Sequence, residues 1–163
     1  AAAIGCTVIG AAGGDAKLDL ARSMGASIVA NYLEADWSDT VRTAVGERRV
    51  TVALDGVGGA IGRTAFELIG PGGRMVLFGY TAGAPMPLET ADLFASGVAV
   101  SAAIGPRLFA RAGGIQALAE LAVERLESGA WSPVVDRFAL ADAAGAHRAL
   151  TDRRTTGKVV LIP

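Results

Sequence analysis

The sequence predicts an α/β fold, a doubly wound parallel sheet with helices on both of its faces. Segments with a strand pattern alternate with amphipathic helix patterns along most of the chain. The strand segments are continuous apolar runs rather than alternating ones, which is typical of strands that helices cover on both sides. The 22 glycines fall mainly at the ends of these segments and indicate tight turns between short elements.

Short apolar runs predict the strands of this sheet. The first run, CTVIGA, contains the single cysteine, Cys6, which we interpret as a small core residue rather than a reactive thiol. A single cysteine also fits a reducing compartment. The predicted strands are 6–11, 27–31, 50–55, 74–80 and 98–105.

Amphipathic segments between these strands predict the helices, most of which end at a glycine. The clearest places Ile115, Leu118, Ala122 and Leu126 on one face. The opening residues AAAIG resemble the last turn of a helix with Gly5 as its stop signal. The predicted helices are 15–25, 36–46, 60–70, 88–95, 113–129 and 141–151.

Composition argues against several function classes. The net charge of −1 gives no electrostatic basis for nucleic-acid binding. No run reaches the roughly 18 apolar residues of a membrane helix, and no signal segment is visible. We therefore expect a cytoplasmic protein without a membrane or nucleic-acid partner. His147 and Cys6 are the only residues of their types, so we expect no metal site.

The segment VIGAAGGDAK (8–17) has the form of a nucleotide site at the end of a strand. In dinucleotide-binding folds an acid at the end of the second strand bonds the ribose and selects NAD. The candidate for this position is Ala12, which follows the run 6–11 and precedes Gly13 and Gly14. Lys17 follows inside the next helix. A helix amino terminus with a lysine suits a ribose 2′-phosphate. Alternatively, Lys17 is an ordinary surface lysine.

Three further strand ends carry candidate residues. Tyr32 could meet the adenosine end of a nucleotide, or it is a half-buried packing tyrosine. The glycines of DGVGG (55–59) permit close approach of a ligand to the backbone, and Asp55 could cap the turn or order the loop. In FGY (78–80), Gly79 leaves backbone groups open to a flat ligand.

Taken in order, these segments resemble the cofactor domain of the medium-chain dehydrogenase/reductase family, in its zinc-free quinone oxidoreductase (zeta-crystallin-like) branch. The resemblance is collinear and spans nearly the whole chain. The segments that carry it are VIGAAGGDAKLDLARSMGASIVANY, VALDGVGG, GPGGRMVLFGYTAG, LESGAWSPVVDRFALADAAGAHRAL and TTGKVVLIP.

The resemblance implies a Rossmann fold that binds NADP(H) and assigns roles to particular residues. Lys17 and Tyr32 match the lysine and tyrosine that hold the 2′-phosphate, and Ala12 matches the position of the NAD-selecting acid. Gly13 and Gly14 would line the phosphate pocket, Val57 would flank the adenine, and Phe78 and Gly79 would present backbone to the nicotinamide. Lys158 matches a lysine that reaches the cofactor cleft. Arg153 matches an arginine on the phosphate side, although its neighbour Arg154 leaves this alignment open.

The family pattern also implies parts that this sequence does not contain. Family members carry a GroES-like catalytic domain, and their nucleotide domain begins with a central strand and a glycine-rich turn. We therefore expect residues 1–129 to form an incomplete dinucleotide-binding domain and 130–163 to form a segment that returns to the catalytic domain. We expect its sheet to close over the missing strand or to be completed by another segment. These residues alone should neither bind the cofactor tightly nor catalyse.

The implied function is NADPH-dependent hydride transfer to a quinone or an activated enone. No catalytic residue is assigned, because the family's substrate contacts come mostly from the domain that this sequence lacks. A non-catalytic nucleotide-binding or redox-sensing module is the alternative, and Ala12 argues against a methyltransferase. Family members also pair an edge strand across a two-fold axis, which implies a homodimer through 98–105.

Overall fold

The computed structural model describes residues 1–103, 105–111 and 113–163. They form two compact units, Ala1–Leu108 and Phe109–Pro163. This division falls earlier in the chain than the domain boundary expected near Gly129, which stays a prediction. None of the described helices is both long enough and apolar enough to cross a membrane.

The first unit alternates strands and helices as the sequence predicts. A short 3₁₀ helix (Ala2–Ile4) opens it and ends at Gly5, whose φ of 83° is left-handed, so the predicted stop signal is confirmed. The elements that follow are β1 (Ile9–Ala12), α1 (Asp15–Ser23), β2 (Ile28–Asn31), α2 (Trp37–Val45), β3 (Val50–Asp55), α3 (Gly59–Glu67), β4 (Ile69–Leu77), α4 (Thr90–Ser96) and β5 (Ala99–Ala102).

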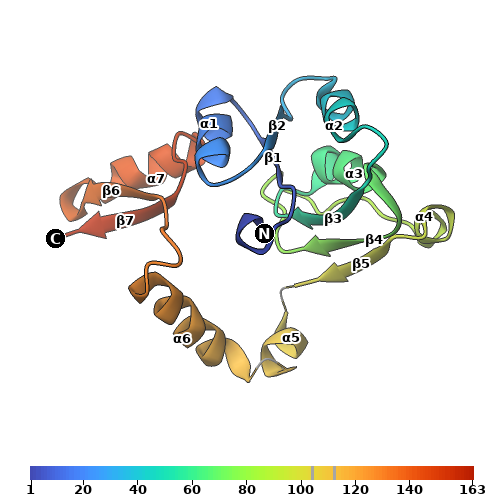
Figure 1. Ribbon diagram of the computed structural model, residues 1–163. Coiled ribbons are helices and arrows are strands. Elements are labelled where there is room, and N and C mark those ends of the chain that lie inside the picture. Colours follow the sequence, from blue (N-terminus) through green and yellow to red (C-terminus); the bar gives the residue numbers. More distant parts are fainter. Residues whose placement is uncertain (104, 112) are drawn as a thin grey trace. The chain divides into compact units, whose positions relative to one another are not determined.

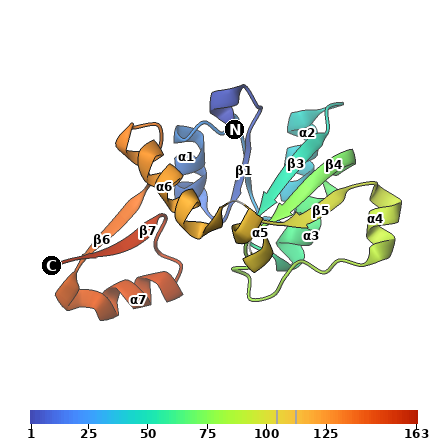
Figure 2. The same cartoon turned by 90° about the horizontal axis from the view of Figure 1, so that it is seen from below.

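The strands of this unit are all parallel but belong to two separate ladders. β1 pairs with β2, and β3, β4 and β5 form a three-stranded sheet in that order (Figures 1 and 2). Parallel pairing confirms the α/β class. Within the described residues no strand joins β1 to β3, so the sheet does not close up in this part of the chain. Completion of the sheet by another segment or a partner stays a prediction.

Side chains, rather than backbone pairing, connect the two ladders. Trp37 and Val41 of α2 are buried with Ala30 of β2. The same cluster takes in Val50 at the start of β3 and Leu68 at the end of α3. A second cluster, formed by Phe66, Ile69, Met75, Met86 and Val98, packs α3 and the loop before α4 against the three-stranded sheet.

The strands that border the gap are more exposed than their apolar sequence predicts. Val52 and Leu54 of β3 are 49% and 69% exposed. Cys6, just before β1, is also exposed, so its interpretation as a core residue is wrong. An apolar strand is buried only where a neighbouring strand and helices cover it, and neither β1 nor β3 has a described neighbour on the side of the gap.

The second unit contains a two-stranded parallel ladder. β6 (Val135–Ala139) pairs with β7 (Lys158–Ile162), and α7 (Ala143–Thr151) packs against both strands. A 3₁₀ turn (Leu140–Asp142) leads into α7, where the Asp142 carboxylate accepts the Gly145 N–H at 3.1 Å and caps the helix.

Two helices precede this ladder. The sequence analysis did not predict α5 (Pro106–Arg111). The expected long helix is present as α6 (Gly114–Glu127), but Ile115 and Leu118 on its apolar face are 65% and 41% exposed. Ile104, in the predicted edge strand 98–105, lies outside the described residues.

Candidate functional site

The carboxyl ends of β1 and β2 bring together Gly13 and Tyr32. Ala12 pairs with Asn31 in the ladder, and the Tyr32 N–H donates to the Ala12 carbonyl at 3.2 Å. A Cβ atom on Gly13 would lie 3.0 Å from Cε2 of the Tyr32 ring, so a larger residue at 13 would require the ring to move by a few tenths of an ångström. The half-buried Tyr32 therefore packs beside the predicted phosphate turn.

The turn between β1 and α1 is held by a residue that the sequence analysis did not single out. The Gly14 N–H donates to Oδ1 of Asn31 at 3.2 Å, and the same oxygen accepts the Leu33 N–H at 3.2 Å. Gly14 precedes α1 with a φ of 92°, which favours glycine. The sequence did contain a signal for this role, because Asn31 is a polar residue at the end of an apolar strand, directly before Tyr32.

The charges around this turn have both signs. Lys17 is half-buried in the first turn of α1, whose amino terminus carries positive dipole charge. Asp15, an exposed acid, lies in the same turn, and Glu34 accepts a hydrogen bond from the Asn31 amide at 3.1 Å. Ala12 leaves the strand end itself without an acid, and Lys17 brings a positive charge to the turn.

A second strand end lies at the carboxyl end of β3. Asp55 is buried, and its Oδ1 accepts the N–H groups of Val57 at 2.8 Å and Gly58 at 3.0 Å. The expectation that Asp55 orders this loop is confirmed. The neighbouring strand continues the pairing, because the Phe78 N–H donates to the Asp55 carbonyl at 2.8 Å.

The glycines of DGVGG are contacted by the protein's own chain, and the close approach of a ligand to them stays a prediction. A Cβ atom on Gly56 would lie 2.7 Å from Cε2 of Phe78, and one on Gly58 would lie 2.8 Å from the Tyr80 Cβ. Gly79 packs on the Gly56 backbone in the same way, since its Cβ would lie 3.2 Å from the Gly56 oxygen. Here the glycines let two loops lie against each other.

The other predicted residues lie in the second unit. Arg153 follows α7 with a left-handed φ of 55°, and Lys158 is the first residue of β7. His147 is an exposed residue of α7. Because the two units are not placed relative to one another, the structure leaves the contribution of Arg153 and Lys158 to the site as a prediction. In the described part of the chain no three metal-ligating residues cluster.

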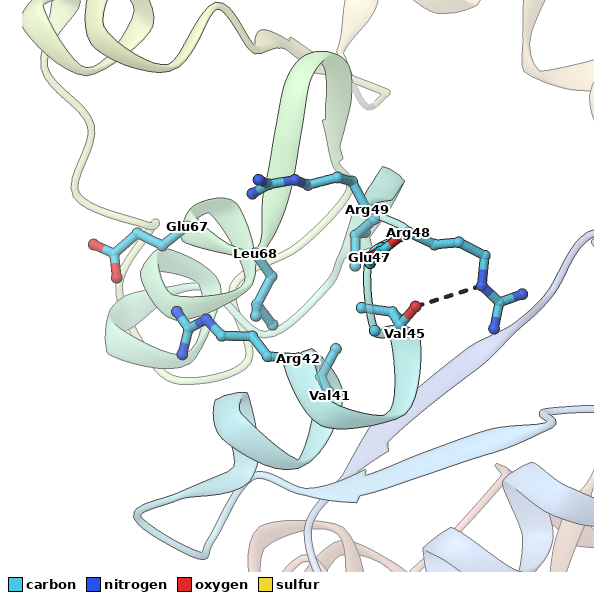
Figure 3. Close-up of a pocket in the computed structure, with 10 residues that line it drawn as sticks. Val41, Arg42, Val45, Glu47, Arg48, Arg49, Glu67 and Leu68 are labelled. Carbon is cyan, nitrogen blue, oxygen red and sulfur yellow. Dashed lines mark hydrogen bonds between the residues drawn. The ribbon is translucent and has the colours of Figure 1, made fainter.

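A cavity of about 260 Å³ lies at the other end of β3, beside Val50 (Figure 3). Its lining includes Arg42, Arg48 and Arg49. Arg48 donates to the Val45 carbonyl at 3.4 Å, at the carboxyl end of α2. Cations at this end of a helix stabilise its free carbonyls and its dipole, which gives Arg48 a structural role, and Glu47 and Glu67 add negative charge to the same lining.

Comparisons with known proteins point to one family. Residues 1–124 match the family model described as zinc-binding dehydrogenase. The chain is 28% identical to a 2-haloacrylate reductase of Burkholderia sp, with 98% of this chain and 49% of that protein covered. It is 30% identical to a quinone oxidoreductase of Pseudomonas aeruginosa, with 100% of this chain and 51% of that protein covered.

A solved structure agrees with these relatives. The Escherichia coli quinone oxidoreductase complexed with NADPH matches with a TM-score of 0.82 at 29% identity, over 99% of this chain and 51% of that one. The chain thus spans about half the length of the proteins that it matches.

Proposed function

Because the chain belongs to the zinc-binding dehydrogenase family, in the quinone oxidoreductase branch of the medium-chain dehydrogenases/reductases, we propose that it is the cofactor-binding part of an NADPH-dependent oxidoreductase. The observation that carries the proposal is the turn after β1. There Gly13 packs against Tyr32, Lys17 lies in the first turn of α1, and Ala12 stands where an NAD-selecting acid would be.

On the adenosine side, Lys17 and Tyr32 would hold the 2′-phosphate of the cofactor. A charge-assisted hydrogen bond from Lys17 favours a phosphate dianion over the ribose hydroxyl of NADH. Gly13 and Gly14 would line the phosphate pocket through their backbone. Asn31 keeps this turn in place through its bond to the Gly14 N–H.

The strand ends of β3 and β4 would provide the remaining contacts to the cofactor. Val57 would flank the adenine, while Phe78 and Gly79 would present backbone to the nicotinamide. Lys158 and Arg153 of the second unit would add contacts to the cleft. When bound, NADPH supplies the hydride, and the protein orients the cofactor and excludes water.

The substrate that we propose is a quinone or an activated enone, reduced without zinc. The relatives named quinone oxidoreductase and 2-haloacrylate reductase support this substrate class. We further propose a cytoplasmic homodimer paired through the edge strand β5. The domain boundary near Gly129, with 130–163 packing on a catalytic domain, belongs to the same proposal.

Titration and turnover of the full-length protein test the proposal. We expect NADPH to bind at least tenfold more tightly than NADH, followed by reduction of 1,4-benzoquinone or of a 2-haloacrylate. Equal affinity for the two cofactors would contradict the role of Lys17 and Tyr32. NADPH binding without turnover of any quinone or enone would favour the non-catalytic module instead.

A further inference from the structure

Asp55 is a buried acid to which the proposed function gives no role. The residue is 6% exposed, and among the described residues it is the one polar or charged residue that is buried. Unlike Asp92, it forms no ion pair within that part. Its Oδ1 accepts the N–H groups of Val57 and Gly58, at 2.8 and 3.0 Å, and Oδ2 lies 3.3 Å from the Gly58 nitrogen.

These bonds set the path of the loop 56–58, which in turn holds the loop after β4. The carbonyl of Gly56 accepts the Thr81 N–H at 3.1 Å, and that of Val57 accepts the Ala82 N–H at 2.8 Å. The Gly59 N–H donates back to the Ala84 carbonyl at 3.0 Å. The two loops are therefore joined by backbone hydrogen bonds directly beyond the paired strand ends.

The helix behind Asp55 is shaped to receive its carboxylate. A Cβ atom on Gly62 of α3 would lie 2.5 Å from Oδ2 of Asp55 and 3.2 Å from the Met86 Cβ. Real Cβ atoms do not approach an oxygen this closely, so a larger residue at 62 would displace the carboxylate. The Asp55 carboxylate therefore lies between Gly62 of α3, which leaves room for Oδ2, and the loop N–H groups of Val57 and Gly58, which bond to Oδ1.

We propose that Asp55 is a positioning residue for the part of the cofactor site that lies beyond the ends of β3 and β4. It acts through the joined loops 56–58 and 78–84, which carry Val57, Phe78 and Gly79. It is not a catalytic residue, because it is buried and its Oδ1 already accepts two N–H groups of its own loop. The inference rests on the proposed function and adds a residue that holds one half of the site.

Two ligands separate the halves of the site in the full-length protein. NADPH would contact Val57, Phe78 and Gly79 in addition to Lys17 and Tyr32, whereas adenosine 2′,5′-bisphosphate has no nicotinamide and would contact Val57 but neither Phe78 nor Gly79. We expect Asp55→Ala to weaken NADPH binding about tenfold or more, by loss of two charge-assisted bonds, with a smaller loss for the bisphosphate, which lacks the contacts to Phe78 and Gly79. Asp55→Asn keeps an acceptor oxygen and should restore most of the NADPH affinity.

Two further variants control this experiment. Asp142→Ala removes a comparable carboxylate-to-backbone bond in α7 and should leave both affinities unchanged. Gly62→Ala leaves Asp55 in the sequence but pushes its carboxylate out of place. It should therefore reproduce the selective loss of NADPH affinity. Gly62→Ala also replaces Asp55→Ala if that variant does not fold.

Each result decides between the claims. Unchanged NADPH affinity in both Asp55→Ala and Gly62→Ala, or equal weakening of both ligands, overturns the positioning role. A parent protein that binds neither ligand overturns the proposed function instead. Amide hydrogen exchange tests the hold of Asp55 on the two loops separately from cofactor binding: we expect faster exchange in Asp55→Ala confined to 56–59 and 78–84, and unchanged exchange there overturns the positioning role.

Discussion

Arg63 of α3 holds both carboxylate oxygens of Asp92 in α4, with Nη1 to Oδ2 at 2.6 Å and Nη2 to Oδ1 at 2.9 Å. The same Asp92 accepts the Glu89 N–H at 2.8 Å and so completes the cap of α4. The two bonds, that of Arg63 above all, hold the pKa of the Asp92 carboxyl below its usual range. This pair fastens α4, which follows the loop 78–84, to α3.

The Arg63–Asp92 pair predicts a loss of stability in acid. Because the pKa of Asp92 is lower in the folded than in the unfolded chain, its stabilisation is complete above about pH 4 and disappears as the pH falls through the folded value. Asp92→Asn should therefore unfold at lower urea than the parent at pH 7 and approach it near pH 2. A difference in urea midpoint between Asp92→Asn and the parent that stays constant over this pH range would contradict the prediction. The control is Asp19→Asn, which removes an acid from an exposed ion pair.

Lys17→Ala should weaken the binding of NADPH with little effect on NADH. Loss of one charge-assisted contact costs about 1.5–3 kcal/mol, which is roughly a 10- to 150-fold change in the dissociation constant. Fluorescence titration of the full-length protein measures both cofactors. Arg22→Ala removes a cation from the exposed last turn of the same helix and should leave both affinities unchanged. Equal weakening of NADPH and NADH by Lys17→Ala would place the lysine away from the 2′-phosphate.

Gly58→Ala should destabilise the first unit more than Gly72→Ala. Both glycines have a left-handed φ, of 73° and 77°, which costs an alanine about 1–2 kcal/mol. A Cβ on Gly72 meets open space, whereas one on Gly58 would lie 2.8 Å from the Tyr80 Cβ and also contact the Ala84 carbonyl. We expect about 1–3 kcal/mol of additional loss from this crowding. Urea unfolding measures the difference, and equal losses would show that the loops separate freely.

Metal analysis of the purified full-length protein should find less than stoichiometric zinc. This chain offers one cysteine and one histidine toward a tetrahedral zinc site, and the proposed function reduces its substrate without zinc. Dialysis against a chelator should leave quinone turnover unchanged, while a zinc-loaded alcohol dehydrogenase serves as the positive control. One bound zinc per chain, with activity lost on its removal, would contradict the proposed branch.

The 163-residue chain by itself should self-associate through β3. Leu54 is 69% exposed on a strand with no described partner on one side, and apolar strands of this kind join to other chains. Leu54→Lys should lower the apparent mass at high concentration, measured by light scattering after gel filtration. Leu33→Lys changes a 71% exposed leucine that lies outside the strands and should have no such effect. An unchanged mass in Leu54→Lys would exclude this edge as the contact.

The alternation of strands and helices was predictable because each element is encoded locally. Apolar runs, helical spacing and glycine stops depend on residues only a few positions apart. Asp55 is an example, since an acid two residues before a loop amide can bond to it without distant partners. The position of Lys17 one turn into α1 follows from the same local rules.

Other features depended on residues that are far apart in the sequence. Arg63 and Asp92 are 29 positions apart, and the contacts of Gly58 with the loop after β4 also cross two elements. Cys6 and Leu54 have the sequence of buried strand residues, yet they are exposed, because burial requires a neighbouring strand that local pattern cannot supply. The sequence alone thus determined most elements of the first unit and the candidate residues, whereas α5, β6 and β7 were not predicted. Only the tertiary structure decided which glycines admit the protein's own chain, which strand edges stay open and which acid is buried, because packing between distant segments sets all three.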